Sequence, residues 1–365
     1  MTAALRFLSG LLSAVLTEAS PRTELVTGSA AADTLVGGSG NDTIQGMLGP
    51  DAISATPLSG EHVVIFGGRG PSDPDDDGDS IVVTGEGSGE IYGNGGSDTI
   101  LYRALGNATI QAGVGDDTVT ILNKANNFVI GGSGADRITI DSFADNTVYG
   151  GNTAINPLDE ADHITIRGSG QNLVFANGGN DEVLIGGDGN NVVYAGVGND
   201  AVRIQGVGSN LLFGGAGSDT LTVEGSGNNT IFGGAGPADA ADAGDVITIV
   251  GDGHNVVYAN GGDDLVRIVG SVGATIYGGV GNDTIVAGDG LDLIVGGSGS
   301  NLLTGGAGAD TFVHAADGND TITDFDFYRG DRIAVSSGAQ AWAWSPDGSL
   351  IVAFADGSSV TIQDA

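Results

Sequence analysis

Hydrophobic residues follow two different patterns along this chain. In residues 1–24, apolar side chains recur every three or four positions, which predicts an α-helix, and Pro21 follows them. From residue 26 onward, short apolar segments alternate with glycine-rich turns, which predicts short β-strands. The apolar positions of the predicted helix are Leu5, Phe7, Leu8, Leu11, Leu12, Val15 and Leu16.

This N-terminal helix has two interpretations. A helix over residues 1–25 would cap the open end of a stacked β structure or pair with another molecule, since an open end exposes core and unpaired strand edges. Alternatively it is a cleaved signal peptide. Arg6 is the only positive residue before the apolar run and no clear small-residue cleavage site follows, so we favour the capping helix.

The β region repeats a nine-residue pattern, G-G-x-G-x-D-x-U-x, where U is a large aliphatic residue. Residues 131–139 and 37–45 are copies, and residues 215–223 follow it displaced by one position. The glycines supply turn conformations that other residues adopt only with strain. The Asp places a carboxylate in the turn, and U begins a strand with an inward side chain. One copy cannot bury its aliphatic residue alone, so the copies must stack.

The aspartates give the length of one turn of the stack. They begin nine residues apart at Asp33, Asp42 and Asp51, and most then lie 19 apart, so one turn contains two half-turns. The second half-turn carries asparagine, at Asn127, Asn146, Asn172, Asn191, Asn210, Asn229 and Asn255. We therefore expect one edge of stacked carboxylates and one edge of stacked amides, and the amides can bond along the stack without a metal.

A longer period relates Asp79, Asp162 and Asp245, which lie 83 apart along the chain. It corresponds to three regular turns followed by one turn with an insertion, and indicates duplication of a four-turn block. The insertions predict three acidic loops along one edge, at residues 71–79, 152–162 and 237–245. They are either solvated loops or extra calcium sites or contact points, the latter most plausible for Asp73, Asp75, Asp76 and Asp77.

An aromatic series lies three residues after the asparagine position. Each member follows an aliphatic residue expected to point inward, so strand alternation places the rings outward, where they form a candidate interface. Alternatively, the longer turn widens the core and the rings are tucked inside. Gln111 and Ile130 interrupt the series, whose members are Phe66, Tyr92, Tyr149, Phe175, Tyr194, Phe213, Phe232, Tyr258 and Tyr277.

The composition is strongly acidic. Asp and Glu number 46 against 11 Lys and Arg, giving a net charge of −35, and there is no Cys among 365 residues. This argues against nucleic-acid binding, which depends on Lys and Arg, and excludes a disulfide scaffold or thiolate zinc site. No apolar run reaches the length of a transmembrane helix. The acidity favours a divalent metal as partner.

At its nonapeptide copies the chain resembles the RTX, or hemolysin-type calcium-binding repeat, family over roughly residues 27–335. The resemblance implies a right-handed parallel β-roll with Ca²⁺ at its Gly-Asp turns. It also implies type I export from a Gram-negative bacterium, with an uncleaved signal in the last 50 or so residues. Residues 320–333 resemble the closing segment of secreted members. Amides on one edge depart from the family pattern, which carries Asp on both edges.

The residues themselves also favour calcium. Stacked aspartates would lie about 4.8 Å apart and repel by roughly 0.9 kcal/mol per pair in water. Ca²⁺ takes 6–8 hard oxygen ligands in adaptable geometry, and binding to the folded state alone couples folding to the metal. The candidate metal ligands are Asp42, Asp51, Asp79, Asp98, Asp117, Asp136, Asp162, Asp181, Asp200, Asp219, Asp245, Asp264, Asp283, Asp292 and Asp310.

Catalytic motifs are not found in the sequence. The histidines His62, His163, His254 and His314 are scattered, and surface positions are expected for them; no zinc motif, P-loop or G-x-S-x-G elbow occurs. Only about 25 residues precede the repeats. We therefore expect no enzyme and no large pore-forming toxin.

The expected protein is all-β: a parallel β-roll of about fourteen turns (26–318), an N-terminal helix or cap (1–25), and a C-terminal β cap with the secretion segment (319–365). In that cap, hairpin strands are expected at residues 341–344, 350–355 and 360–363. We expect a secreted protein that folds on calcium and self-associates at the cell surface or in a matrix, as a surface layer, filament or adhesin. Alternatives are a polysaccharide- or ice-binding module, or a small toxin or bacteriocin using the N-terminal helix.

Overall fold

The computed structural model describes residues 23–154, 156–315, 318–335 and 338–363. Every regular secondary-structure element among these residues is a β-strand, as the predicted all-β class requires. The helix predicted for residues 1–25 lies almost entirely outside the described residues. The chain divides into two compact units, of which the first ends at Glu182 and the second begins at Val183.

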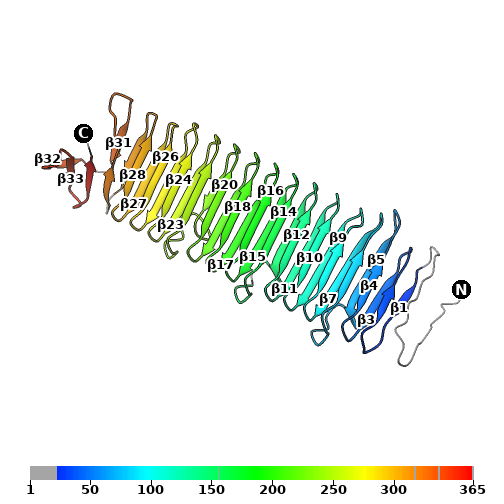
Figure 1. The fold of residues 1–365 in the computed structure, drawn as a ribbon. Coiled ribbons are helices and arrows are strands. Elements are labelled where there is room, and N and C mark those ends of the chain that lie inside the picture. Colours follow the sequence, from blue (N-terminus) through cyan, green and yellow to red (C-terminus); the bar gives the residue numbers. More distant parts are fainter. Residues whose placement is uncertain (1–22, 155, 316–317, 336–337, 364–365) are drawn as a thin grey trace. The chain divides into compact units, whose positions relative to one another are not determined.

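Unit 1 is a parallel β-solenoid (Figure 1). Odd-numbered strands pair with odd-numbered strands and even with even, so the chain passes between two sheets at every half-turn. Its strands are β1 (Leu25–Thr27), β2 (Thr34–Val36), β3 (Thr43–Met47), β4 (Ala52–Ala55), β5 (His62–Gly68), β6 (Ser80–Val83), β7 (Ser88–Gly95), β8 (Thr99–Tyr102), β9 (Ala108–Val114), β10 (Thr118–Leu122), β11 (Asn127–Ser133), β12 (Arg137–Asp141), β13 (Asn146–Gly151), β14 (His163–Arg167) and β15 (Asn172–Gly178). The next strand, β16 (Glu182–Gly186), begins at Glu182, the last residue of unit 1.

Alternation along each strand builds the core. In β12, Ile138 and Ile140 are fully buried, whereas Arg137 is exposed. Ile138 stands in register with Val119 of β10, so each buried aliphatic side chain packs on its equivalent one turn away. Val148 of β13 contributes in the same way from the facing sheet. The aliphatic position of the repeat therefore points inward, as predicted.

The turns between the sheets depend on glycine at close contacts between successive coils. Gly132 has a φ of 127°, and a Cβ on it would lie 1.8 Å from the carbonyl oxygen of Gly113 in the preceding turn. An L side chain there would be strained and would also collide with the backbone. This requirement accounts for the regular recurrence of glycine in the sequence.

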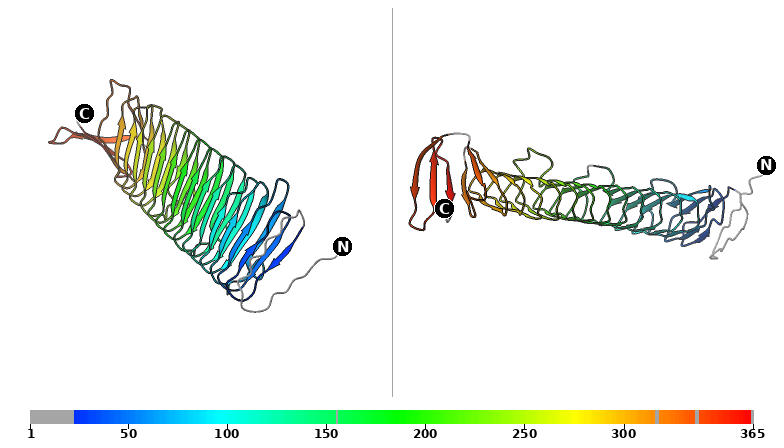
Figure 2. Two further views of the ribbon diagram at one scale, coloured as in Figure 1. Left: turned by 45° about the vertical axis from the view of Figure 1, so that its right-hand side comes forward. Right: turned by 90° about the horizontal axis from the view of Figure 1, so that it is seen from above.

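Unit 2 continues the same strand pattern and ends in an antiparallel sheet. Its further strands are β17 (Val192–Val197), β18 (Ala201–Gln205), β19 (Leu211–Ala216), β20 (Thr220–Glu224), β21 (Thr230–Phe232), β22 (Val246–Val250), β23 (Val256–Gly261), β24 (Leu265–Val269), β25 (Thr275–Val280), β26 (Thr284–Gly288), β27 (Leu293–Ser298), β28 (Leu302–Gly306), β29 (Thr311–His314), β30 (Asn319–Ile322), β31 (Arg332–Val335), β32 (Ala339–Trp344), β33 (Leu350–Phe354) and β34 (Ser359–Ile362). The strands β32, β33 and β34 form the antiparallel sheet, and β34 pairs in parallel with β30 (Figure 2). The predicted C-terminal hairpin strands are confirmed.

The number of turns exceeds the expectation slightly. The odd-numbered strands β1 to β31 number 16 in the described part of the chain, about one per turn, against about fourteen turns expected. Part of the difference arises because β31 (Arg332–Val335), which pairs with β29, lies beyond residue 318, where the β-roll was expected to end.

Candidate metal sites

The aspartates of one edge form a hydrogen-bonded ladder in each unit. The backbone N–H of Asp79 donates to Oδ1 of Asp98 at 2.6 Å, and that of Asp98 donates to Oδ1 of Asp117 at 2.7 Å. Each of these carboxylates thus commits one oxygen to a neighbouring turn. This aspartate ladder consists of Asp33, Asp51, Asp79, Asp98, Asp117, Asp136, Asp162 and Asp181 in unit 1, and of Asp200, Asp219, Asp245, Asp264 and Asp283 in unit 2.

The second carboxylate oxygen of most members is buried and receives no hydrogen bond. These Oδ2 atoms belong to Asp51, Asp79, Asp98, Asp117, Asp136, Asp162, Asp219, Asp245, Asp264 and Asp283. A buried acceptor without a donor costs about 1–3 kcal/mol, and more if it is charged. The aspartate ladder therefore requires a proton or a cation at these oxygens.

On the other edge, the equivalent side-chain atom is the Nδ2 of an asparagine, and it forms hydrogen bonds. Asn146 Nδ2 donates to the carbonyl of Ala144 at 2.9 Å and to Oδ1 of Asn172 at 2.8 Å. This asparagine ladder comprises Asn127, Asn146 and Asn172 in unit 1, and Asn191, Asn210, Asn229 and Asn255 in unit 2. The predicted edge of stacked amides, which bond to one another along the stack, is confirmed.

Burial strongly favours the neutral form of the ladder carboxyls. It raises the pKa of Asp98, Asp162 and Asp264 to about 9, although a backbone N–H bonded to each carboxylate opposes the shift and neighbouring aspartates add to it. The pKa of Asp136 and of Asp245 rises to about 8 for the same reasons. Without a bound cation, much of the aspartate ladder is protonated at neutral pH.

The oxygens around the ladder suit a hard cation. A Cβ added to Gly93 would lie 2.2 Å from Asp98 Oδ2 and 2.2 Å from the carbonyl oxygen of Ala112 in the next turn, so these two oxygens face one small space. Gly131 is placed likewise against Asp136 Oδ2. Carboxylate and carbonyl oxygens are the ligands that Ca²⁺ prefers, so the residues fit calcium.

Side chains alone do not complete such a site. In the part of the chain that the structure describes, three or more acidic, histidine or cysteine side chains nowhere converge on a metal position. An ion on the aspartate ladder would therefore depend on backbone carbonyls as well as carboxylates. Those carbonyls belong to the glycine-rich turns, which explains why the aspartate and its glycines repeat together.

The predicted ligands Asp42, Asp292 and Asp310 lie on the edge of the asparagine ladder rather than on the aspartate ladder. Asp292 Oδ1 accepts the N–H of Ala274 at 2.6 Å, and Asp310 Oδ1 accepts that of Asp292 at 2.9 Å. Asp42 Oδ1 accepts the N–H of Glu24 at 3.0 Å. The asparagine edge is thus acidic at its ends.

His314 is not at the surface, contrary to the expectation for the histidines. It is 4 % exposed, its Nδ1 lies 2.6 Å from Asp320 Oδ2, and its Nε2 lies 3.0 Å from Ser358 Oγ. The expectation was wrong because His314 closes a β-strand, β29, beneath the C-terminal sheet, where its ring stacks on Phe354. Its irregular sequence position gave no indication of this contact.

Most rings of the aromatic series face outward, although Phe232 is buried. The preceding aliphatic residues are buried, whereas the rings are mostly half-buried because they stack on one another. In unit 1, Phe66 stacks on Tyr92 at 5.1 Å between ring centroids, and Tyr149 stacks on Phe175 at 5.0 Å. This aromatic ladder continues in unit 2 through Tyr194, Phe213, Phe232, Tyr258 and Tyr277, at 4.7–4.9 Å.

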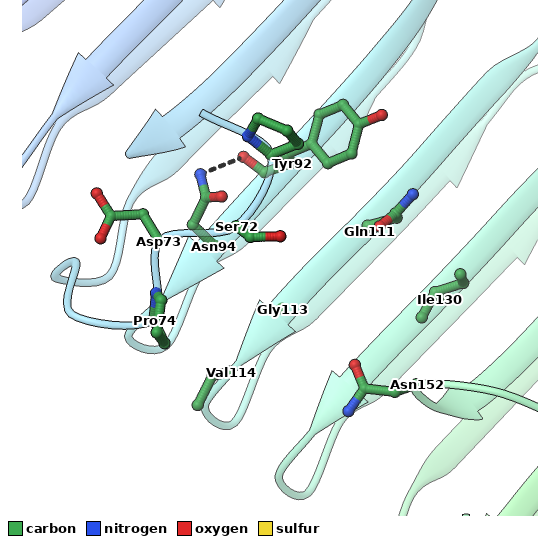
Figure 3. A pocket seen from close by; sticks show the side chains of 11 residues that line it. Ser72, Asp73, Pro74, Tyr92, Asn94, Gln111, Gly113, Val114, Ile130 and Asn152 are labelled. Atoms are coloured by element: carbon green, nitrogen blue, oxygen red, sulfur yellow. Dashed lines mark hydrogen bonds between the residues drawn. The ribbon is translucent and has the colours of Figure 1, made fainter. Parts of the chain in front are cut away.

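A pocket of about 260 Å³ opens on the outer face of unit 1, where the aromatic ladder is interrupted (Figure 3). Tyr92, Gln111 and Ile130 form its floor from β7, β9 and β11. Residues 71–74 of the first inserted loop and Asn152 of the second line its sides. The smaller side chains at the interruption leave the space that a ring fills elsewhere.

Comparison with known proteins identifies the repeats. The family model of the RTX calcium-binding nonapeptide repeat, in 4 copies, matches residues 21–55, 123–152, 177–203, 225–236, 249–267 and 277–312. No curated protein matches the chain significantly. In the described residues, no helix has the length and apolar character to cross a membrane.

Proposed function

The chain carries RTX calcium-binding nonapeptide repeats, and from this premise we propose that it is a secreted structural protein that folds on calcium and assembles outside the cell. The ions would lie along the aspartate ladder and supply the positive partner that its negatively charged Oδ2 atoms lack. Type I export fits such a chain, because a chain that folds only where Ca²⁺ is abundant stays unfolded until it is outside.

The observation that carries the calcium part of the proposal is the contrast between the two ladders. Asn146 Nδ2 has two acceptors, whereas the Oδ2 of Asp136 has no donor and is buried. The backbone places both side chains alike, so the difference is chemical. A cation at the aspartate edge restores what the amide supplies at the other edge.

The aromatic ladder supports self-association. Outward stacked rings form an apolar strip along each unit, and exposed apolar strips on soluble proteins usually mark interfaces. Two such strips packed face to face would bury the rings of both molecules. A structural role without enzymatic activity fits a chain whose acidic residues are organised by the repeat.

The test is circular dichroism and light scattering of the whole protein in excess chelator and in about 1 mM Ca²⁺, the upper range for extracellular modules. We expect the β signal to develop with Ca²⁺ and the mass to rise above that of a monomer. An unchanged β signal in chelator would contradict calcium-dependent folding. A wild-type protein that stayed monomeric at all concentrations would contradict self-association. A Phe213→Ser/Tyr258→Ser variant that associated as strongly as the wild type would contradict association through the rings.

A second candidate is polysaccharide binding, favoured by the pocket beside Tyr92 and Gln111. An aromatic face next to a side-chain amide is suited to stack against a sugar ring and bond to its hydroxyls. Co-sedimentation with insoluble polysaccharides would test it, with Tyr92→Ser as the variant expected to lose binding. The ice-binding and toxin alternatives gain no support from a specific contact.

A further inference from the structure

Three inserted loops repeat the same acidic design outside the nonapeptide turns. Figure 2 shows the first two loops projecting from unit 1 and the third projecting from unit 2. With the spacing of the long period they carry Asp76, Asp159 and Asp242 in equivalent positions. Each is followed three residues later by a member of the aspartate ladder: Asp79, Asp162 and Asp245.

Each equivalent loop aspartate has a buried carboxylate oxygen without a hydrogen-bond donor. Asp76 is 7 % exposed and its Oδ2 receives no hydrogen bond, and Asp159 is 9 % exposed with neither oxygen bonded. Burial raises the pKa of Asp76 and of Asp159 to about 6, although backbone N–H groups, including those of Gly49 and Gly134, oppose the shift. Asp242 Oδ2 is likewise buried and unbonded. Solvated loops have no reason to bury a carboxylate in this way, because an isolated buried charge is strongly unfavourable.

In the first and third loops, a second carboxylate oxygen lies close to the equivalent aspartate. A Cβ on Gly68 would lie 2.9 Å from Asp76 Oδ2 and 3.1 Å from Asp73 Oδ2, so two carboxylates share the space above this glycine. Gly234 is placed in the same way, 2.7 Å from Asp242 Oδ2 and 3.1 Å from Asp239 Oδ2. In the second loop a Cβ on Gly151 would lie 2.1 Å from Asp159 Oδ2 and 2.7 Å from Asn156 Nδ2, so an amide takes the place of the second carboxylate.

An asparagine with left-handed backbone completes each loop region from the next turn. Asn94, Asn177 and Asn260 have φ values of 84°, 85° and 87°, and Oδ1 of Asn94 and of Asn177 is buried without a donor. In unit 2, Asn260 Oδ1 accepts the N–H of Gly234 at 3.2 Å, which places it at the same glycine as the loop carboxylates.

The first loop shows how close these groups lie. Figure 3 shows Asn94 next to Ser72, Asp73 and Pro74, and the carbonyls of Pro74 and Asp73 lie 2.7 and 3.1 Å from the position of a Cβ on Gly95. Arg69 Nε is 4.0 Å from Asp73 Oδ2. The group thus offers oxygens of three chemical kinds: carboxylate, amide and carbonyl.

We propose that each inserted loop binds one Ca²⁺ through its buried aspartate, the asparagine of the next turn and loop carbonyls, at a site separate from the aspartate ladder. Ca²⁺ accepts such mixed oxygen sets, whereas Mg²⁺ demands stricter geometry. This goes beyond the proposed function, since it concerns the insertions rather than the nonapeptides. Because Asp73 and Pro74 also line the pocket on unit 1, the first ion would order one of its sides.

The test counts Ca²⁺ bound to the whole chain by equilibrium dialysis and metal analysis at about 1 mM free Ca²⁺. We compare Asp76→Asn/Asp159→Asn with the matched control Asp75→Asn/Glu160→Gln, which changes exposed acids in the same two loops. The buried pair should lose two ions per chain and the control none. An equal count in both variants would overturn the proposal.

Two further outcomes distinguish Ca²⁺ binding in the inserted loops from Ca²⁺ binding along the aspartate ladder. If the aspartate ladder binds no calcium, the wild type should hold only about three ions, and the buried pair should still lose two of them. If the buried-pair variant does not fold, crystals of the wild type grown with Tb³⁺ decide the question. Anomalous peaks in the loops are expected, and their absence there would overturn the proposal.

Discussion

His314 Nδ1 lies 2.6 Å from Asp320 Oδ2. Asp320 lies on the edge of the aspartate ladder, one turn after Asn301, which itself follows Asp283 on that edge. Asn301 Nδ2 donates to the other oxygen of Asp320 at 2.8 Å. Both oxygens of this buried aspartate are therefore bonded to protein groups. Near the end of unit 2, protein side chains thus supply the partners that a proton or a cation would supply at the other ladder aspartates.

Replacing His314 should show that the buried carboxylate of Asp320 needs a partner at its Oδ2 atom. In His314→Phe the ring still packs on Phe354, but Asp320 Oδ2 loses its partner, and we expect a loss of about 1–3 kcal/mol in the free energy of unfolding in Ca²⁺. Adding Asp320→Asn should restore part of it. Thermal unfolding measures the effect, with His62→Phe at an exposed position as control; equal stability of the two single variants would refute the role.

Exchanging Asp and Asn between the ladders should change the need for calcium in opposite directions. Asn146→Asp removes donations to Ala144 and Asn172 and creates a buried carboxylate, so we expect about 1–3 kcal/mol less stability in chelator. Asp136→Asn should lower the Ca²⁺ concentration needed for half-maximal folding. Circular dichroism during Ca²⁺ titration checks both, and shifts of the same sign would contradict the contrast between the ladders.

Acid should partly replace calcium. The pKa of Asp98 rises from 3.8 to about 9 on folding, because burial disfavours the charged form. A group whose pKa is raised in the folded state stabilises that state fully below pH 4, and this contribution is lost as the pH climbs toward 9. In chelator, the β signal should therefore increase as the pH falls from 9 to 4. A β signal in chelator that stayed constant or decreased over this range would refute protonation of the aspartate ladder.

Glycine beside the aspartate ladder should tolerate no side chain. In Gly131→Ala the new Cβ would lie 2.2 Å from Asp136 Oδ2 and 2.4 Å from the Gly150 carbonyl oxygen. We expect a loss of about 1–3 kcal/mol and weaker Ca²⁺ binding. Gly186→Ala is the matched control, since a Cβ there meets nothing within 4 Å. Chemical unfolding in Ca²⁺ compares them, and equal midpoints would contradict the steric argument.

Features that repeat at fixed spacing could be predicted from the sequence. The inward aliphatic positions, the length of one turn and the asparagine ladder follow from periodicity, because stacked turns place equivalent residues side by side. Periodicity also predicts that the rings stack in a series but leaves open whether they point outward. The family resemblance added calcium, and the buried Oδ2 atoms now give a physical reason for it.

Features that depend on contacts between different elements could not be predicted. The burial of His314 arises from β34 pairing with β30, which brings Ser358 over it. By contrast, the edge occupied by Asp292 and Asp310 could have been predicted, because each nine-residue half-turn after Asp283 moves the chain to the opposite edge. The burial of Asp76 and Asp159 depends on how each loop folds back, which composition alone does not determine.

The long period of the chain has a consequence for the gene. Ala52 of β4 pairs with Ser80, and His163 occupies in the next copy the position that Ser80 holds in the first. A deletion of residues 79–161 would therefore join Gly78 to Asp162 and leave compatible pairing partners on both sides. Unequal recombination between copies would yield shorter or longer chains that still fold, so close relatives can differ in length by whole blocks while their terminal segments stay the same.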